Sequence, residues 1–219
     1  MQPFQPHLQV LPPAQQKLWP ELVEIPNHFV LYGGTAVALR LGHRSSVDFD
    51  FFTNESFTPD DLLKSIRPLQ GGKILQNVSQ TLTLSVHRGE EVKLSFFGGL
   101  PFGRVGEPQM TPDSVLKVAS LLDLAGMKAA VVTQRAESKD YLDLLALIEH
   151  GISLPQAMAA AASIYGNQYN PALTLKSLTY FGDGDLHRLT SQQRNQLIRI
   201  VSGVNLSLPQ VPRMADTLA

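Results

Sequence analysis

The sequence predicts an α/β (α+β) protein in which a mixed, largely antiparallel sheet comes first and helices follow. Short runs of β-branched and aromatic residues, bounded by Gly and Pro, are concentrated before residue 100. After residue 120, apolar residues recur at helical spacing over long stretches. The 219 residues suit one domain, or one with an appended subdomain. We expect a sheet domain with an N-terminal arm over residues 1–111 and a mainly helical subdomain over residues 112–219, divided at a Gly- and Pro-rich stretch.

The first 41 residues predict a strand between two helices. Apolar side chains fall on one helical face before residue 25, and an apolar run of β-formers then stops at Gly33-Gly34. Helical spacing resumes at Thr35, and Gly42 is suited to end that helix. A loose arm, a helix, a strand and a second helix are therefore expected, in that order, over residues 1–13, 14–25, 28–32 and 35–41.

The next segment predicts a strand that carries two acids on one face. Residues 47–52 read Val-Asp-Phe-Asp-Phe-Phe, so Asp48 and Asp50 project from the side opposite to the apolar residues. A helix is expected from Thr58 to Leu69, because Pro is tolerated at the first helical position and acids favour the first turn. Three more strands are expected over residues 73–78, 81–87 and 92–97.

The second half opens with one more strand candidate and continues as helices. Ser120-x-x-Asp123 resembles a capping box at the start of the first long helix. The strand is expected over residues 115–119, and the helices over residues 120–134, 137–150, 153–165, 171–181 and 191–201. The tail after Leu208 is expected to be loose.

Composition excludes several classes of function. The 18 Lys and Arg nearly balance the 19 Asp and Glu, giving a net charge of −1, so the bulk composition is not that of a strongly basic nucleic-acid-binding protein. The absence of Cys excludes disulfides, thiol catalysis and Cys-ligated metal sites. The N-terminus does not read as a signal peptide, and no apolar run approaches the ~18–20 residues of a membrane span. We expect a cytoplasmic protein with no membrane partner.

Two short motifs point to phosphate chemistry. A Gly-Gly turn at a helix start, here Gly33-Gly34-Thr35, lets backbone N–H groups approach an anion closely, and the helix dipole favours negative charge there. Asp48 and Asp50 would repel each other unless a cation lies near them. Mg²⁺ ions are the usual cations where a phosphate group is transferred. Either motif alone is common in turns and solvated strands, and only their conjunction in one short unit is informative.

Three stretches together resemble the AbiEii/AbiGii-type nucleotidyltransferases of the polymerase-β-like superfamily. The first is FVLYGGTAVALRLGHRSSVDFDFF, residues 29–52. The second, from Ser120, contains Lys128, Arg135 and a Lys-Asp pair at 139–140, and the third covers residues 170–181. The resemblance spans about residues 29–185, most of the chain. It implies a nucleotidyltransferase fold and a Mg²⁺- or Mn²⁺-dependent reaction with an NTP as substrate.

The resemblance also implies roles for residues of the first half. Gly33, Gly34 and Thr35 would bind the β- and γ-phosphates of the NTP. Asp48 and Asp50 would ligate the metal and act as catalytic residues. Positioning and charge neutralisation would carry most of the rate of such a reaction.

Further roles follow for the loop before the acids and for the helical half. Arg44 and Ser46 would touch phosphate or fix the loop. Lys128 and Arg135 would offset phosphate charge, and Asp140 would hold one of these cations or a substrate group. The resemblance thus implies that Lys128 and Asp140 are catalytic residues and that Arg135 binds the NTP. Taken by themselves, Lys128 could equally be a surface lysine with a buried stem, and Asp140 a favourable charge at a helix start.

One position departs from the pattern of the superfamily. Many members carry a third carboxylate on a later strand, and the best-aligned residue here is Ser95, a poor Mg²⁺ ligand beside carboxylates. Glu91 lies two side-chain positions earlier on the same strand face. Asp123 is another candidate, although its spacing after Ser120 suits a helix cap.

The function implied is transfer of an NMP to an acceptor hydroxyl, such as a tRNA 3′ end, by the toxin of a type IV toxin–antitoxin or phage-defence pair with a separate antitoxin protein. Two alternatives stay open. One is a catalytically weakened nucleotide-binding or interaction module that keeps the fold, which Ser95 favours. The other is a nucleotidyltransferase acting on a small, antibiotic-type molecule, with which the near-neutral charge is compatible.

Overall fold

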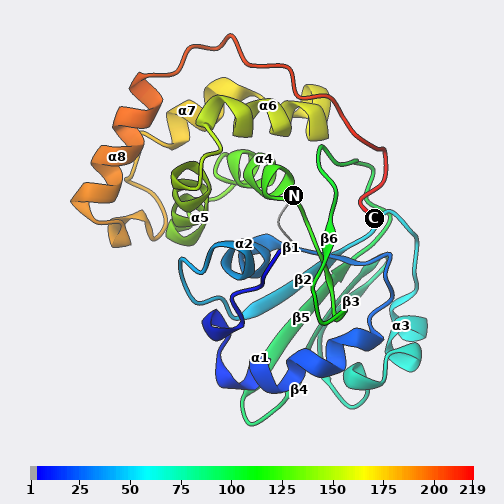
Figure 1. Ribbon diagram of the computed structural model, residues 1–219. Helices are drawn as coiled ribbons and strands as arrows, with labels where there is room; N and C mark the ends of the chain where they lie inside the picture. Colours follow the sequence, from blue (N-terminus) through cyan, green and yellow to red (C-terminus); the bar gives the residue numbers. More distant parts are fainter. Residues whose placement is uncertain (1–3) are drawn as a thin grey trace. The chain divides into compact units, whose positions relative to one another are not determined.

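The computed structural model describes residues 4–219 and divides them into two compact units (Figure 1). The first unit comprises the described residues up to Gly103 with Glu107–Ser120 and Ala215–Ala219. The second comprises Arg104–Gly106 and Leu121–Met214. The division expected after residue 111 therefore falls inside the first unit, because the next strand of the chain belongs to its sheet.

The first unit is built on one seven-stranded sheet, in the order β3-β4-β5-β2-β1-β7-β6. β2 and β5 pair in parallel, as do β1 and β7, and the other four pairs are antiparallel. The predicted mixed, largely antiparallel sheet is confirmed. The strands are β1 (Val30–Tyr32), β2 (Asp48–Phe52), β3 (Lys73–Val78), β4 (Thr81–His87), β5 (Glu91–Phe97), β6 (Gln109–Met110) and β7 (Lys117–Val118).

Two helices of the first unit are shorter than the sequence predicts, and a proline lies just beyond each of them. The expected helix over residues 14–25 is an α-helix followed by a 3₁₀ segment that contains Pro20, which has no N–H to donate. The expected helix over residues 58–69 likewise ends early, before a 3₁₀ turn that contains Pro68. The segments are α1 (Pro13–Leu18), η2 (Trp19–Glu24), α2 (Gly33–Leu41), α3 (Pro59–Ser65) and η3 (Arg67–Leu69), with η1 (Leu8–Val10) before them.

An aromatic core forms on the apolar face of the central strands. Phe49 and Phe51 of β2 are fully buried, and the Phe51 ring stacks on Phe96 of β5 at 5.1 Å between centroids. Phe29 meets Phe96 edge-on at 5.3 Å. This cluster fixes β2 with its other face, the one that carries Asp48 and Asp50, turned away from the core.

Arg40 ties α2 to the far edge of the sheet. Its guanidinium donates to the carbonyl oxygens of Ala119 at 2.6 Å and Val118 at 2.9 Å, and to Gln109 Oε1 at 2.9 Å. The arm also docks on this helix, where the His7 N–H donates to the Leu39 carbonyl at 2.8 Å. The arm was expected to be loose; residues 1–3 of it lie outside the described residues.

The second unit is a helical bundle of α4 (Leu121–Val131), α5 (Ser138–Glu149), α6 (Leu154–Tyr165), α7 (Pro171–Ser177) and α8 (Ser191–Ser202), with 3₁₀ turns η4 (Gly166–Gln168) and η5 (Leu186–Arg188). α4 and α6 approach closely at Gly126, where an added Cβ would lie 2.9 Å from the backbone nitrogen of Ala161. The alanine-dense stretch of α6 permits this approach. Among the described residues, no single helix is long and apolar enough to cross a membrane. Helix α5 and the segment Leu154–Gln168 reach that length and apolar composition only together, and the chain bends by 115° between them.

The tail that was expected to be loose is held at both ends. Within the second unit, Arg213 Nη2 donates to the carbonyls of Ser163 at 2.9 Å and Ile164 at 3.0 Å. Within the first unit, the Leu218 side chain is buried and its N–H donates to Asn54 Oδ1 at 2.5 Å. The final residues of the chain are therefore part of the sheet unit.

Candidate active site

The start of α2 and the middle of β2 meet at the Gly-Gly turn. Gly33 has a φ of +72°, a conformation that side chains rarely adopt, and a Cβ added to it would lie 2.6 Å from Asp50 Oδ2. Tyr32, just before the turn, pairs with Asp50 across the antiparallel strands. Only glycine at position 33 leaves room for the Asp50 carboxylate beside the backbone of the helix start.

Thr35 joins the helix start to the strand that carries the acids. Its side chain is buried, its hydroxyl donates to the Asp48 carbonyl, and its Oγ1 lies 2.9 Å from the hydroxyl of Ser46, which is also buried. The side chains of Thr35 and Ser46 are therefore engaged within the protein. Because no side chain caps α2 at Tyr32, the first backbone N–H groups of α2 are the donors suited to an anion here.

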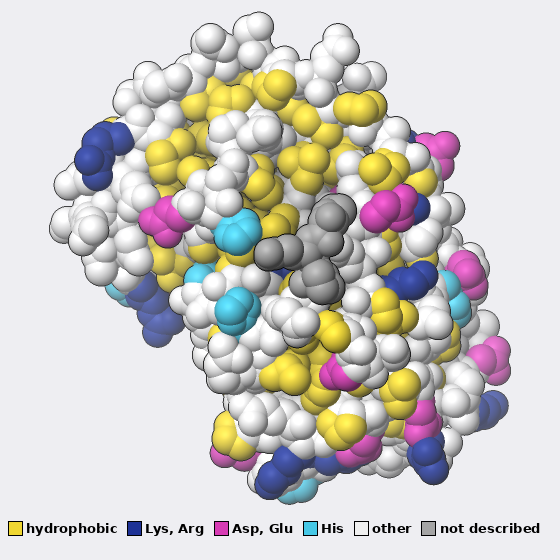
Figure 2. Space-filling model, in the orientation of Figure 1, with side chains coloured by type: hydrophobic (Ala, Val, Ile, Leu, Met, Phe, Trp, Pro, Cys, Tyr) yellow, Lys and Arg dark blue, Asp and Glu magenta, His cyan; other side chains and the backbone are white. Residues whose placement is uncertain are grey.

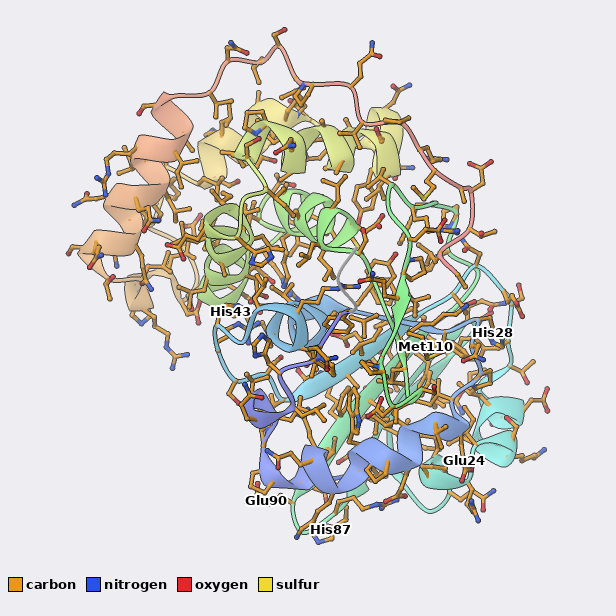
Figure 3. The ribbon with its side chains drawn as sticks, in the orientation of Figure 1. Glu24, His28, His43, His87, Glu90 and Met110 are labelled. Atoms are coloured by element: carbon orange, nitrogen blue, oxygen red, sulfur yellow. The ribbon has the colours of Figure 1, made fainter. Side chains whose placement is uncertain are left out.

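The loop between α2 and β2 carries Arg44 and also His43, which is labelled in Figure 3. Arg44 is half-buried, and its Nη1 donates to the neighbouring Ser45 carbonyl at 2.8 Å. Ser45 in turn donates through its hydroxyl to the Val10 carbonyl of the arm at 2.9 Å. The loop before the acids is thus fixed by the arm and by its own side chains.

The polar face of β2 continues onto β5. In the parallel pair, Asp48 lies beside Lys93 and Asp50 beside Ser95. Lys93 Nζ lies 3.7 Å from Asp48 Oδ2, and both side chains are partly exposed. Ser95 is 2% exposed. The acid pair therefore has a lysine and a buried serine as its neighbours on the next strand.

The two other candidates for a third acid are engaged elsewhere. Glu91 accepts a hydrogen bond from the Ser85 hydroxyl and lies 3.1 Å from His87 Nδ1, near the β4–β5 turn where Figure 3 labels His87 and Glu90. These two contacts, Ser85 first, hold the pKa of Glu91 below its usual value. In the second unit, Asp123 accepts the N–H groups of Val105 at 2.8 Å and Gly106 at 3.0 Å. Asp123 thus anchors the loop at Val105 and Gly106 within the second unit.

Charged residues of the second unit form a buried cluster of their own. Lys128 Nζ of α4 lies 2.6 Å from Asp140 Oδ1 and 2.7 Å from Asp143 Oδ2, and both carboxylates of α5 are fully buried. Arg135 Nε donates to Asp140 Oδ2 at 2.7 Å. Burial opposes ionisation of Asp140, but Arg135 and Lys128 outweigh it, so its pKa lies below the usual value. Asp140 therefore holds both cations, and of the two Arg135 is the exposed one, with 48% of its side chain accessible.

A family model described as the nucleotidyl transferase AbiEii toxin of type IV toxin–antitoxin systems matches residues 20–207. The chain belongs to this family. The resemblance that the sequence motifs carry is thereby confirmed, and the chain is a nucleotidyltransferase by family.

One known protein is similar to this AbiEii-family chain in sequence, and two solved structures are similar to it in fold. An uncharacterized protein of Aquifex aeolicus (strain VF5) is 34% identical over 162 residues, which cover 73% of this chain and 76% of that protein. MenT4, a nucleotidyltransferase toxin of Mycobacterium tuberculosis H37Rv, has a similar fold with a TM-score of 0.58 at 16% identity, covering 88% of this chain and 82% of MenT4. A protein of H. pylori provisionally described as a nucleotidyltransferase gives 0.53 at 16% identity, with 86% and 90% covered.

Two residues of this AbiEii-family chain, one in each unit, contact candidate site residues of their own unit although sequence reasoning did not place them there. Lys93 is near Asp48 only because β5 pairs with β2 in a particular register, which local patterns do not reveal. Asp143 of α5 lies in an ion pair with Lys128. Its spacing of three residues after Asp140 places the two on one helical face, and that signal could have linked them.

Proposed function

We propose that this chain is a Mg²⁺- or Mn²⁺-dependent nucleotidyltransferase that moves an NMP from an NTP to an acceptor hydroxyl, and that it is the toxin of a type IV toxin–antitoxin or phage-defence pair in the cytoplasm. The observation that carries the proposal is the contact of the Gly33 turn with the Asp50 carboxylate. It brings a helix start suited to an anion next to a carboxylate of the acid pair.

The residues at this turn fit a divalent metal. Asp48 and Asp50 offer carboxylate oxygens from one strand face, the ligands that Mg²⁺ and Mn²⁺ prefer. The space that a Cβ at Gly33 would fill is left open beside Asp50 Oδ2. These two residues would hold the metal, which when bound supplies positive charge to phosphate oxygens.

The rest of the unit would bind and orient the NTP. The backbone N–H groups of Gly33, Gly34 and Thr35 are suited to the β- and γ-phosphates. The hydroxyls of Thr35 and Ser46 keep β2 in place relative to that turn. Arg44 would fix the loop or reach a phosphate.

Residues of the second unit would contribute charge and order. We assign Arg135 to anion binding, because its guanidinium is half exposed and Asp140 fixes its orientation. Lys128 would act mainly by organising α4 and α5, since two carboxylates already accept from its ammonium. The reaction proposed is attack of the acceptor oxygen on the α-phosphorus. The bond to the β-phosphate breaks, and pyrophosphate leaves.

A tRNA end is the acceptor class that we propose, with an antitoxin protein as a further partner. On the face shown in Figure 2, Lys and Arg side chains are interspersed with Asp and Glu, so a small-molecule acceptor stays a second outcome of the test. Binding of tRNA weakens steeply with added salt, whereas transfer to a small neutral acceptor does not. Repeating the assay over a range of salt concentrations separates the two.

The test is a label-transfer assay with the purified chain, each labelled NTP, Mg²⁺ or Mn²⁺, and an extract that contains tRNA, protein and small metabolites. The proposal expects transfer by the wild type and by Asp60→Ala, which alters an exposed acid of α3. It expects none from the Asp48→Ala, Asp50→Ala double variant. Transfer that persists in the double variant contradicts the proposal. No transfer under any condition favours the weakened binding module, for which Ser95 beside Asp50 is the supporting observation.

A further inference from the structure

The residues of β5 that lie beside Asp48 and Asp50 are a lysine and a serine, and neither is an acid. The side chains at paired positions of parallel strands lie on the same face of the sheet, so Lys93 and Ser95 stand beside Asp48 and Asp50 respectively. Lys93 Nζ is 3.7 Å from Asp48 Oδ2, and Ser95 is 2% exposed. One neighbour is thus a partly exposed, positively charged side chain, and the other is a neutral, buried hydroxyl.

This arrangement bears on how many metal ions the site takes. Two divalent ions about 3.5–4 Å apart need enough anionic oxygens to offset their mutual repulsion. Here Ser95 adds no charge, and the Lys93 ammonium already lies at one of the two carboxylates. Within residues 4–219, no group of three His, Cys, Asp or Glu side chains is placed to hold a metal ion.

We propose that Lys93 supplies the second positive charge of the site, so that Asp48 and Asp50 take one divalent ion rather than two. The inference rests on the proposed function and deepens it. Lys93 is then a positioning residue, since it acts through Asp48. Its ammonium holds that carboxylate and takes the place of a cation that a third acid would otherwise help to bind.

The test counts bound Mn²⁺ by electron paramagnetic resonance, with a non-hydrolysable α,β-methylene NTP analogue present. The wild type is expected to bind one Mn²⁺ per chain. The double variant Lys93→Met, Ser95→Asp is expected to bind two, because it removes the ammonium and adds a carboxylate beside Asp50. Two ions on the wild type, or one on the folded double variant, would overturn the inference.

A single variant keeps the test valid should the buried Ser95→Asp change prevent folding. Lys93→Met alters a partly exposed side chain and is expected to tighten Mn²⁺ binding about tenfold, because it removes a repelling charge next to the metal. Lys64→Met, an exposed lysine of α3, is the matched control and should leave Mn²⁺ affinity unchanged. Unchanged Mn²⁺ binding in Lys93→Met, or weaker binding of both Mn²⁺ and analogue, would overturn the inference; the second result would make Lys93 a phosphate ligand.

The same experiment separates this inference from the proposed function. If the wild type binds two Mn²⁺ and the Asp48→Ala, Asp50→Ala variant binds none, the inference is wrong and the proposed metal site stands. If the wild type binds no more Mn²⁺ than that variant, both are wrong.

Discussion

Gly33 and Asp50 lie so close that a single added carbon on Gly33 would stand 2.6 Å from Asp50 Oδ2. The turn that is suited to phosphate and the carboxylate that is suited to metal are thus one structural unit, although separate stretches of sequence supply them. Position 33 requires glycine for two reasons: a side chain would collide with Asp50, and the backbone has a φ of +72°. The following predictions start from this contact and extend to the second unit.

Gly33→Ala is predicted to lower nucleotidyl transfer at least about a hundredfold, because the Asp50 carboxylate must move away from the new methyl group, and displacements near 1 Å cost that much. Gly71→Ala is a matched control: Gly71 has a φ of +76°, and an added Cβ there meets nothing within 4 Å. Both changes should cost about 1–2 kcal/mol of stability from the left-handed backbone. Equal activity losses in the two variants would contradict the prediction.

Lys128→Met is predicted to lower the free energy of unfolding by about 3–5 kcal/mol, because it leaves two buried carboxylates, Asp140 and Asp143, without that ammonium. Urea denaturation followed by circular dichroism measures the loss. Lys139→Met, which alters a half-exposed lysine of α5, should cost less than about 1 kcal/mol. Combining Lys128→Met with Asp143→Leu should restore part of the loss, and strict additivity of the two changes would contradict a direct pair.

The ion pairs of Asp140 make the free energy of unfolding depend on pH. Its pKa lies below the usual 3.8, so its ion pairs contribute fully above about pH 4 and are lost as the pH falls through the lower, folded-state pKa. Asp140→Asn should therefore lower the unfolding free energy by about 2 kcal/mol at pH 7. The difference from wild type should shrink below pH 4. A difference that stays constant from pH 7 to pH 3 would contradict this account.

Gly126→Val is predicted to destabilise the second unit by about 1–3 kcal/mol, because its side chain would push against the backbone of α6 at Ala161. Gly126→Ala tests the same contact: helix propensity alone would favour Ala by up to about 1 kcal/mol, yet we expect a net loss. Gly203→Ala, where the nearest atom to an added Cβ is 3.6 Å away, is the control. Thermal unfolding of the three variants decides, and a stabilising Gly126→Ala would show that the helices can separate without cost.

Local sequence patterns predicted the strand that carries Asp48 and Asp50. The alternation around Asp48 and Asp50 is a two-residue period, so their common face follows from the sequence alone. Pro20 and Pro68 could have been used to divide the predicted helices, since their missing N–H groups are visible in the sequence.

The pairing of strands that are far apart in the sequence could not be predicted from local patterns. β7 joins the sheet by pairing in parallel with β1, and this contact carries the first unit past the expected division at residue 111. The positions of Lys93 and Ser95 beside the acids depend equally on the β2–β5 register. A one-residue slip would turn both side chains to the other face, and nothing local specifies that choice.

The central claim is that the site at Asp50 transfers an NMP, which carries the α-phosphate of the NTP, to an acceptor. The most direct measurement compares two labelled forms of the NTP. The purified chain is incubated with acceptor extract and metal, once with the label on the α-phosphate of the NTP and once on the γ-phosphate. The account predicts that the α label becomes bound to acceptor, that the γ label leaves as pyrophosphate, and that Asp50→Asn abolishes both while Asp60→Asn does not. Transfer of the γ label to acceptor, or undiminished transfer by Asp50→Asn, would contradict it.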